Sequence, residues 1–173
     1  RYPDKEFLTT PMTREAERCR MALDAAKAGR RVAMVCSGDS GIYGMAGLLF
    51  ELRGESQDPE ISVVPGLTAA CSGGAVLGAP LTHDFAVISL SDRLTAWETI
   101  EKRLEAAAGA DLSIVLYNPA SKGRPDYLRR ACEILLRQLP EDRPCGVARN
   151  IGRTGESGEV LSLARLRDYP ADM

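Results

Sequence analysis

The stretch Arg31-Val-Ala-Met-Val-Cys-Ser-Gly-Asp-Ser-Gly-Ile-Tyr-Gly44 decides the fold that we expect for this chain. Residues 32–36 are apolar throughout, as in a strand that is buried on both faces. A loop with three glycines and one aspartate follows, and the apolar residues after it predict a helix over 42–52. In such a strand–turn–helix unit, glycine lets the backbone approach a ligand, and the helix N-terminus offers free N–H groups to an anion.

The spacing of these glycines excludes some classes of ligand. It matches neither the G-x-G-x-x-G pattern of dinucleotide-binding folds nor the G-x-x-x-x-G-K-[ST] pattern of phosphate loops. No lysine follows the loop, which argues against a nucleoside triphosphate. We therefore expect a ligand with a small carboxylate end.

The rest of the chain repeats the alternation of strand and helix. Thr13 is the expected N-cap of a first helix over 12–28, with Gly29 as its stop. The remaining expected strands are 61–64, 85–90, 112–117, 145–149 and 159–163, and the remaining helices are 67–77, 95–108 and 125–139. This order predicts an α/β fold with mostly parallel sheets. A break without periodicity at 78–84 predicts two α/β domains, a partial one over 1–79 and a second over 80–173.

The composition of the chain excludes several classes of function. Of the 173 residues, 45% are hydrophobic and 27% are charged, as in a globular protein with a core. The net charge of −2, without a long basic run, argues against nucleic-acid binding. No apolar stretch reaches the roughly 18 residues of a membrane span, and no signal peptide is visible. The five cysteines are scattered and there is one histidine, so we expect no metal site and a cytoplasmic protein with reduced thiols.

The two ends are unlike those of an intact protein. The chain does not begin with methionine, and it stops in what reads as a loop. We expect a portion of something longer, truncated at both ends.

Polar and glycine-rich residues follow the expected strands in step. They lie at 37–41, 65–68, 91–93, 118–124 and 150–153. In open α/β sheets the ligand binds at the carboxyl ends of the strands. We therefore expect these five loops to gather on one edge, which plain connections would not require.

Single residues in these loops allow two interpretations each. Asp39 either accepts hydrogen bonds from a ligand or caps the helix that follows, and Thr68 has the same ambiguity. His83 beside Asp84 is either a general base or a structural hydrogen-bond partner. The basic residues at strand ends either bind substrate carboxylates, which suit arginine, or are solvated surface charges.

Three motifs resemble those of a known family. They are Ser37-Gly-Asp-x-x-x-Tyr-Gly44, Val63-Val-Pro-Gly-x-Thr-Ala-Ala70 and Gly78-Ala-Pro-Leu-x-His-Asp-Phe85, and together they resemble the tetrapyrrole methylases. Residues 83–98 and 116–125 resemble most the members that methylate carbon 17 of a precorrin-3 type ring in cobalamin biosynthesis. The likeness runs over essentially the whole chain, although the Gly-x-Gly-Pro-Gly loop with which the family opens is not in it.

This resemblance implies a fold, a cofactor and an assembly. The family has two α/β domains with a cleft between them, uses S-adenosylmethionine, releases S-adenosylhomocysteine and forms homodimers. Carried over position by position, the cofactor-binding residues are Ser37, Gly38, Asp39, Ile42, Thr68, Ala69, Asn118, Asn150 and Ile151.

The resemblance also implies a reaction. C17 of a precorrin or cobalt-precorrin would take the methyl group, and contraction of the macrocycle would need a proton donor or acceptor. The candidates for proton transfer are His83, Asp84 and Asp92. The candidates for binding the substrate's acetate and propionate groups are Arg93, Lys122, Arg124, Arg149 and Arg153.

Three other functions stay open at this point. The chain could be a sister methylase that acts on another ring position or on another substrate. It could be an α/β protein that binds phosphorylated ligands, such as nucleotides, without methyl transfer. It could also be a non-catalytic fragment or scaffold that keeps the fold.

Overall fold

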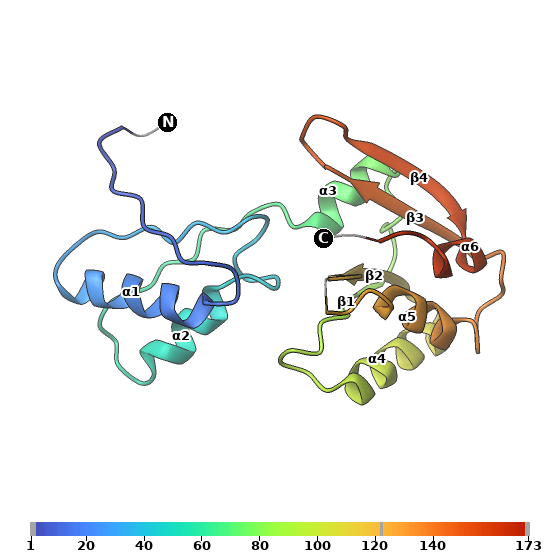
Figure 1. The fold of residues 1–173 in the computed structure, drawn as a ribbon, viewed down its shortest axis with the longest axis horizontal. Helices are drawn as coiled ribbons and strands as arrows, with labels where there is room; N and C mark the ends of the chain where they lie inside the picture. The colour runs from blue at the N-terminus through green and yellow to red at the C-terminus, as the bar shows by residue number, and fades with distance from the viewer. Residues whose placement is uncertain (1–2, 122, 172–173) are drawn as a thin grey trace. The chain divides into compact units, whose positions relative to one another are not determined.

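The computed structural model describes residues 3–121 and 123–171 and divides the chain into two compact units, Arg1–Thr68 and Ala69–Met173 (Figure 1). The sequence placed the boundary between residues 79 and 80 instead. The difference concerns helix α3 (Ala69–Val76), which packs on strands of the second unit and so belongs to it.

The first unit contains two helices that pack on each other, α1 (Glu15–Lys27) and α2 (Ala46–Arg53). Helix α1 ends as expected, with Gly29 at a φ of 83°. Its N-cap is Arg14 and not Thr13, whose φ is 74° and whose N–H donates to Glu15. Helix α2 begins at Ala46 rather than at residue 42, because residues 42–45 form a turn.

The two strands expected in the first unit do not form. Residues 32–36 and 61–64 belong to no β-ladder among the described residues of this unit. Each segment exposes apolar side chains to solvent, since Val35 is 83% exposed and Val64 is 80% exposed. A strand needs a hydrogen-bonded neighbour, and within the described part of this unit neither segment has one.

The second unit has a parallel pair of strands covered by helices. Strand β1 (Phe85–Ser89) pairs with β2 (Ser113–Tyr117), with Val87 opposite Val115. Helices α4 (Trp97–Gly109) and α5 (Tyr127–Leu135) pack against each other, and α4 also contacts both strands (Figure 1). The main core lies here and includes Ile88, Leu90, Ile100, Leu104, Leu128, Ala131, Cys132, Ile134, Leu135 and Leu163.

A hairpin completes the second unit. Strands β3 (Pro144–Arg149) and β4 (Ser157–Ser162) are antiparallel, so one of the two described sheets is parallel and the other is not. Helix α3 packs on this hairpin, where Gly146 lies under Leu77. Helix α6 (Leu163–Arg167), which the sequence did not predict, follows β4 and begins at Ser162, whose Oγ accepts the N–H of Arg165 at 3.3 Å.

Among residues 3–121 and 123–171, every helix is too short or too polar to cross a lipid bilayer.

Candidate functional site: the strand-end loops

In the first unit, Asp39 joins the two loops that the motifs predicted to be a site. Its Oδ1 accepts the N–H of Gly41 at 2.7 Å, and its Oδ2 accepts the N–H of Gly66 at 2.8 Å. Both interpretations of Asp39 from sequence are therefore incomplete, because its carboxylate holds one loop to another. The backbone donors, Gly66 first and then Gly41, hold the pKa of Asp39 below its usual range, so the side chain stays ionised.

The backbones of the same two loops lie against each other. A Cβ at Gly66 would overlap the carbonyl oxygen of Gly38, and Gly38 has a φ of 74°. Only glycine permits this approach at position 66, and glycine adopts the conformation of position 38 without steric cost. The structure thus brings Gly38 and Asp39 together with residues 66–68, as the sequence predicted, and leaves Ser37 and Ile42 on the exposed side of the loop.

In the second unit, the polar residues after β1 and β2 are neighbours. The amide of Asn118 donates to Ser89 Oγ at 2.9 Å, and Asn118 takes a φ of 55°. The hydroxyl of Tyr117 accepts the N–H of Ala70, in the first turn of α3, at 2.7 Å. These bonds fix the carboxyl ends of both strands and the start of α3 in one place, as the parallel pairing predicts.

Asp92 and Arg124 meet at this edge. Nη1 of Arg124 lies 3.2 Å from Asp92 Oδ1 and donates to Ser91 Oγ at 2.7 Å, and its Nε donates to Ser121 Oγ at 3.1 Å. The sequence proposed Asp92 for proton transfer and Arg124 for substrate binding, in separate roles. The structure pairs them.

Tyr127 is the partner that sequence reasoning missed. Its hydroxyl donates to Asp92 Oδ2 at 2.6 Å. This bond, followed by the charge of Arg124, holds the pKa of Asp92 below its usual range, and the same carboxylate raises the pKa of Tyr127. An ionised, doubly engaged Asp92 is suited to holding neighbours in place rather than to moving a proton. The signal in the sequence was a tyrosine at the expected start of a helix, three residues after Arg124.

The ring of Tyr127 is itself held by a stack of side chains. Its centroid lies 4.7 Å from that of Trp97, and the guanidinium of Arg130 lies 4.0 Å from the Trp97 centroid and 5.0 Å from the Tyr127 centroid. Contacts of this kind are attractive and restrict the rings.

The loop after β3 is tightly turned. Asn150 has a φ of 51°, and its side chain donates to the carbonyl of Gly155 at 3.3 Å. The side chain of Ile151 reaches Gly73 on α3. Arg149 is half-buried, whereas Arg153 is exposed and begins the turn back toward β4.

The remaining predicted residues have few contacts. His83, Asp84 and Arg93 are exposed, and among the described residues no side-chain hydrogen bond reaches the imidazole of His83. Lys122 lies outside the described residues. Ala69 is the first residue of α3.

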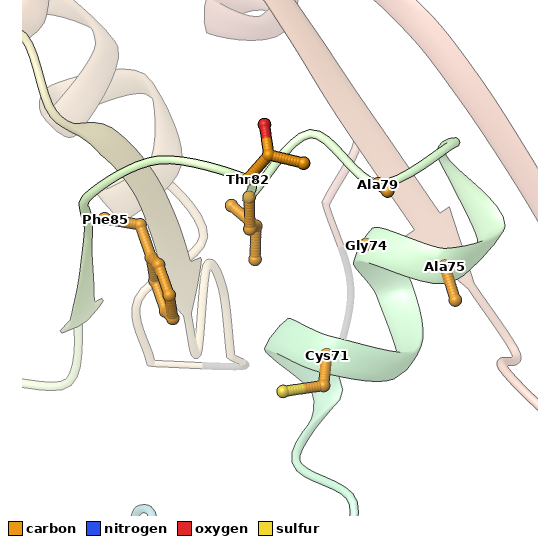
Figure 2. A pocket seen from close by; sticks show the side chains of 7 residues that line it. Cys71, Gly74, Ala75, Ala79, Thr82 and Phe85 are labelled. Carbon is orange, nitrogen blue, oxygen red and sulfur yellow. The ribbon is translucent and has the colours of Figure 1, made fainter.

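An apolar hollow lies beside α3 in the second unit. It has a volume of about 300 Å³ and is lined by Cys71, Gly74, Ala75, Ala79, Leu81, Thr82 and Phe85. Figure 2 shows Phe85 on one side, with Cys71 and Gly74 on the other. Its lining has no charged side chain, so it suits an apolar group.

No group of three or more His, Cys, Asp or Glu side chains within residues 3–121 and 123–171 could hold a metal ion. The five cysteines are free thiols.

Comparison with known proteins identifies the fold and the motifs. The family model for tetrapyrrole (corrin/porphyrin) methylases matches residues 1–167. The "Probable cobalt-factor III C(17)-methyltransferase" of Salmonella typhimurium is 46% identical over 171 residues, which are 98% of this chain and 71% of that protein. The precorrin-3B C(17)-methyltransferase of Sinorhizobium sp is 41% identical and is matched over 99% of this chain and 69% of its own length.

Solved structures agree. The methyltransferase CobJ superposes with a TM-score of 0.82 at 40% identity, over 87% of this chain and 64% of that one. A uroporphyrin-III C-methyltransferase from Thermus thermophilus, complexed with S-adenosylhomocysteine, shares the fold at 21% identity with a TM-score of 0.69. The α/β architecture with strand-end loops, the motifs that fill those loops and these matches lead to one conclusion: the chain belongs to the tetrapyrrole methylases.

Proposed function

We propose that this chain is the S-adenosylmethionine-dependent methyltransferase part of cobalamin biosynthesis that methylates C17 of a precorrin-3 type tetrapyrrole, with contraction of the ring. The observation that carries the proposal is the 46% identity, over nearly the whole chain, to a relative named for methylation at C17. The chain spans 71% of the Salmonella relative, 69% of the Sinorhizobium relative and 64% of the CobJ structure, and about a third of the Priestia megaterium relative. The activity of the whole protein is therefore part of the proposal.

The loop pair joined by Asp39 fits the methionine end of the cofactor. Ser37 and the glycines of these loops are exposed, and the ionised Asp39 supplies a negative charge for an ammonium group. The close approach of Gly38 and Gly66 leaves no room for a side chain at position 66. From the family resemblance, we assign six further residues to binding of the same cofactor: Ile42, Thr68, Ala69, Asn118, Asn150 and Ile151.

Methyl transfer requires no covalent bond between the protein and the reactants. When bound, S-adenosylmethionine supplies an electrophilic sulfonium methyl group. The residues named above bind and orient it, so that the nucleophilic carbon of the ring is aligned with the methyl and water is kept out.

The substrate carries carboxylates that need cationic partners. Arg93, Lys122, Arg124, Arg149 and Arg153 are the basic residues that we assign to them. Arginine suits this role because its planar fork matches a carboxylate.

Ring contraction needs a proton donor or acceptor, and we assign this role to His83 with Asp84. The imidazole of His83 is exposed, so a substrate can reach it. His83→Ala should keep cofactor affinity and lower turnover, measured by calorimetry with S-adenosylhomocysteine and by product formation. Unchanged turnover would remove His83 from the mechanism.

The experiment that tests the cofactor is a thermal-shift titration with S-adenosylhomocysteine. A specific ligand raises the unfolding midpoint as its concentration exceeds Kd. Adenosine triphosphate is the matched control, because a protein that binds phosphorylated ligands without methyl transfer would respond to it instead. A shift with adenosine triphosphate alone would overturn the proposal in favour of that other class.

The reaction is tested with radiolabelled methyl donor and two ring substrates, precorrin-3B and cobalt-factor III. Label in the ring, located at C17 by NMR of the product, is the expected result. Label at another ring position would identify a sister methylase. Cofactor binding without any transfer would identify a non-catalytic fragment.

We also propose a cytoplasmic homodimer. The free thiols of the described cysteines support a reducing compartment. Light scattering of the purified chain tests the dimer, and a monomer at micromolar concentration would contradict it.

A further inference from the structure

A cluster of interacting side chains lies in the second unit. Only two of its members, Asp92 and Arg124, were given a role above. It consists of Ser91, Asp92, Ser121, Arg124 and Tyr127, and we call it the Arg124 cluster. It joins the loop after β1, the loop after β2 and the first residue of α5. Its contacts are all within one compact unit.

Arg124 is held on two of its three nitrogens. Nε donates to Ser121 Oγ and Nη1 donates to Ser91 Oγ and to Asp92, at 3.1, 2.7 and 3.2 Å. No described residue accepts a hydrogen bond from Nη2. The side chain is 17% exposed, so the guanidinium is largely enclosed yet reachable.

Such an arrangement prepares a guanidinium for an anion. An arginine that is free in solvent must lose rotamer freedom before it binds, whereas Arg124 has already lost it to its neighbours. The remaining N–H groups on Nη2 suit one carboxylate oxygen, and the hydrogen bond would be charge-assisted.

Asp92 connects Tyr127 to Arg124. The hydroxyl of Tyr127 donates to Oδ2, which leaves Oδ1 facing Arg124. The tyrosine ring cannot easily turn away, because it is 9% exposed and packs against Trp97. Without the hydroxyl, the Asp92 carboxylate would lose one of its two anchors and could rotate.

We propose that Tyr127 is a positioning residue that, through Asp92, holds Arg124 with its Nη2 group directed to a carboxylate of the tetrapyrrole substrate. The proposal rests on the proposed function, because the anion is taken to be a side chain of that ring. It assigns Asp92 to positioning in place of proton transfer.

The test measures binding of uroporphyrin III, a ring with carboxylate side chains, by fluorescence titration, with its methyl ester as the uncharged comparison. Arg124→Gln should weaken uroporphyrin binding about tenfold, as for the loss of one charge-assisted hydrogen bond. Tyr127→Phe should weaken it about threefold to tenfold, since the ring and its packing remain. Neither variant should change binding of the ester.

A double-mutant cycle separates positioning from a general structural effect. If Tyr127 acts through Arg124, then Tyr127→Phe has no further effect in the Arg124→Gln background. An equal loss in both backgrounds would overturn the proposal. Tyr169→Phe and Arg137→Gln are the matched controls, because Tyr169 packs on the same core and Arg137 pairs with Glu101 and Glu105 elsewhere on the surface.

Two further outcomes are decisive. Asp92→Asn replaces Tyr127→Phe if the latter does not fold, and it should reproduce the loss because it removes the charge that faces Arg124. If wild type binds uroporphyrin and Arg124→Gln binds it equally well, the inference is wrong while the proposed function stands. If wild type binds neither uroporphyrin nor S-adenosylhomocysteine, both are wrong.

Discussion

Asp39 accepts a hydrogen bond from the backbone of Gly66, 27 residues further along the chain, at 2.8 Å. The two residues lie in different motifs, and each motif alone would read as a turn. Their hydrogen bond connects the two loops, because the other oxygen of Asp39 accepts the N–H of Gly41 in its own loop. The Asp39 carboxylate therefore connects the two loops of the proposed cofactor site.

The first prediction concerns this carboxylate. Asp39→Ala should lower both the thermal midpoint and the affinity for S-adenosylhomocysteine, the latter about tenfold, because the loops lose their connection. Calorimetry and thermal unfolding measure the two effects. Asp142→Ala, at an exposed aspartate, is the control and should change neither.

Gly66→Ala asks whether Asp39 acts by joining the loops or by touching the ligand. The added Cβ would overlap the Gly38 carbonyl oxygen without changing any charge. A loss of affinity equal to that of Asp39→Ala would support the loop connection. Full affinity in Gly66→Ala would leave direct contact as the role of Asp39.

The second prediction concerns acid. The pKa of Asp39 is lower in the fold than its usual 3.8, so its contribution to stability is complete above that pH and is lost as the pH falls through the folded value. Urea unfolding between about pH 5 and pH 2 should therefore show a smaller loss of stability in Asp39→Asn than in wild type. Identical slopes would mean that the carboxylate gains nothing from the two N–H groups.

A third prediction concerns thiol reactivity. Burial raises the pKa of Cys132 to about 12, and the residue is 0% exposed. Cys71 is exposed, so iodoacetamide near pH 8 should label Cys71 well before Cys132 in native protein. Mass spectrometry of tryptic peptides measures the order. Because the folded pKa lies above the usual 9.0, the contribution of Cys132 to stability should fall between pH 9.0 and about 12.

A fourth prediction concerns the packing of α3. A Cβ at Gly146 would lie 2.5 Å from Cδ1 of Leu77, so Gly146→Ala should lower the free energy of unfolding by about 1–3 kcal/mol. Denaturant unfolding measures this. Gly123→Ala, which meets nothing within 4 Å, should stay within about 0.5 kcal/mol of wild type. Adding Leu77→Ala to Gly146→Ala should cost less than the sum of the two, and strict additivity would show that the two side chains do not meet.

The sequence predicted the second unit well. Residues 85–90 and 112–117 were expected as strands, and they form β1 and β2 because each is the partner of the other. The same apolar pattern at 32–36 and 61–64 gave no strand. Local pattern sets a propensity, whereas a ladder depends on a neighbour that the pattern does not specify.

The candidate site also divides into residues that local sequence predicts and partners that it does not. Asp39 and Arg124 were named from their loops, since loop composition and strand ends are visible in sequence. The hydrogen-bond partners in the two sites were not predicted. Gly66 lies 27 residues from Asp39, and Tyr127 lies 35 residues from Asp92, the residue that pairs with Arg124. Hydrogen bonds of this range are fixed only by the packed fold.

The proposed cofactor loop belongs to the unit in which Cys19, Leu23, Ala46 and Pro59 are the buried apolar residues among those described, while the main core lies wholly in the other unit. Occupancy of the loop and folding of the first unit are therefore linked equilibria. The observed Kd is the intrinsic one divided by the fraction of molecules whose first unit is folded. Affinity for the methyl donor should accordingly decline on warming before the second unit unfolds, and saturating ligand should bring the two unfolding transitions closer together.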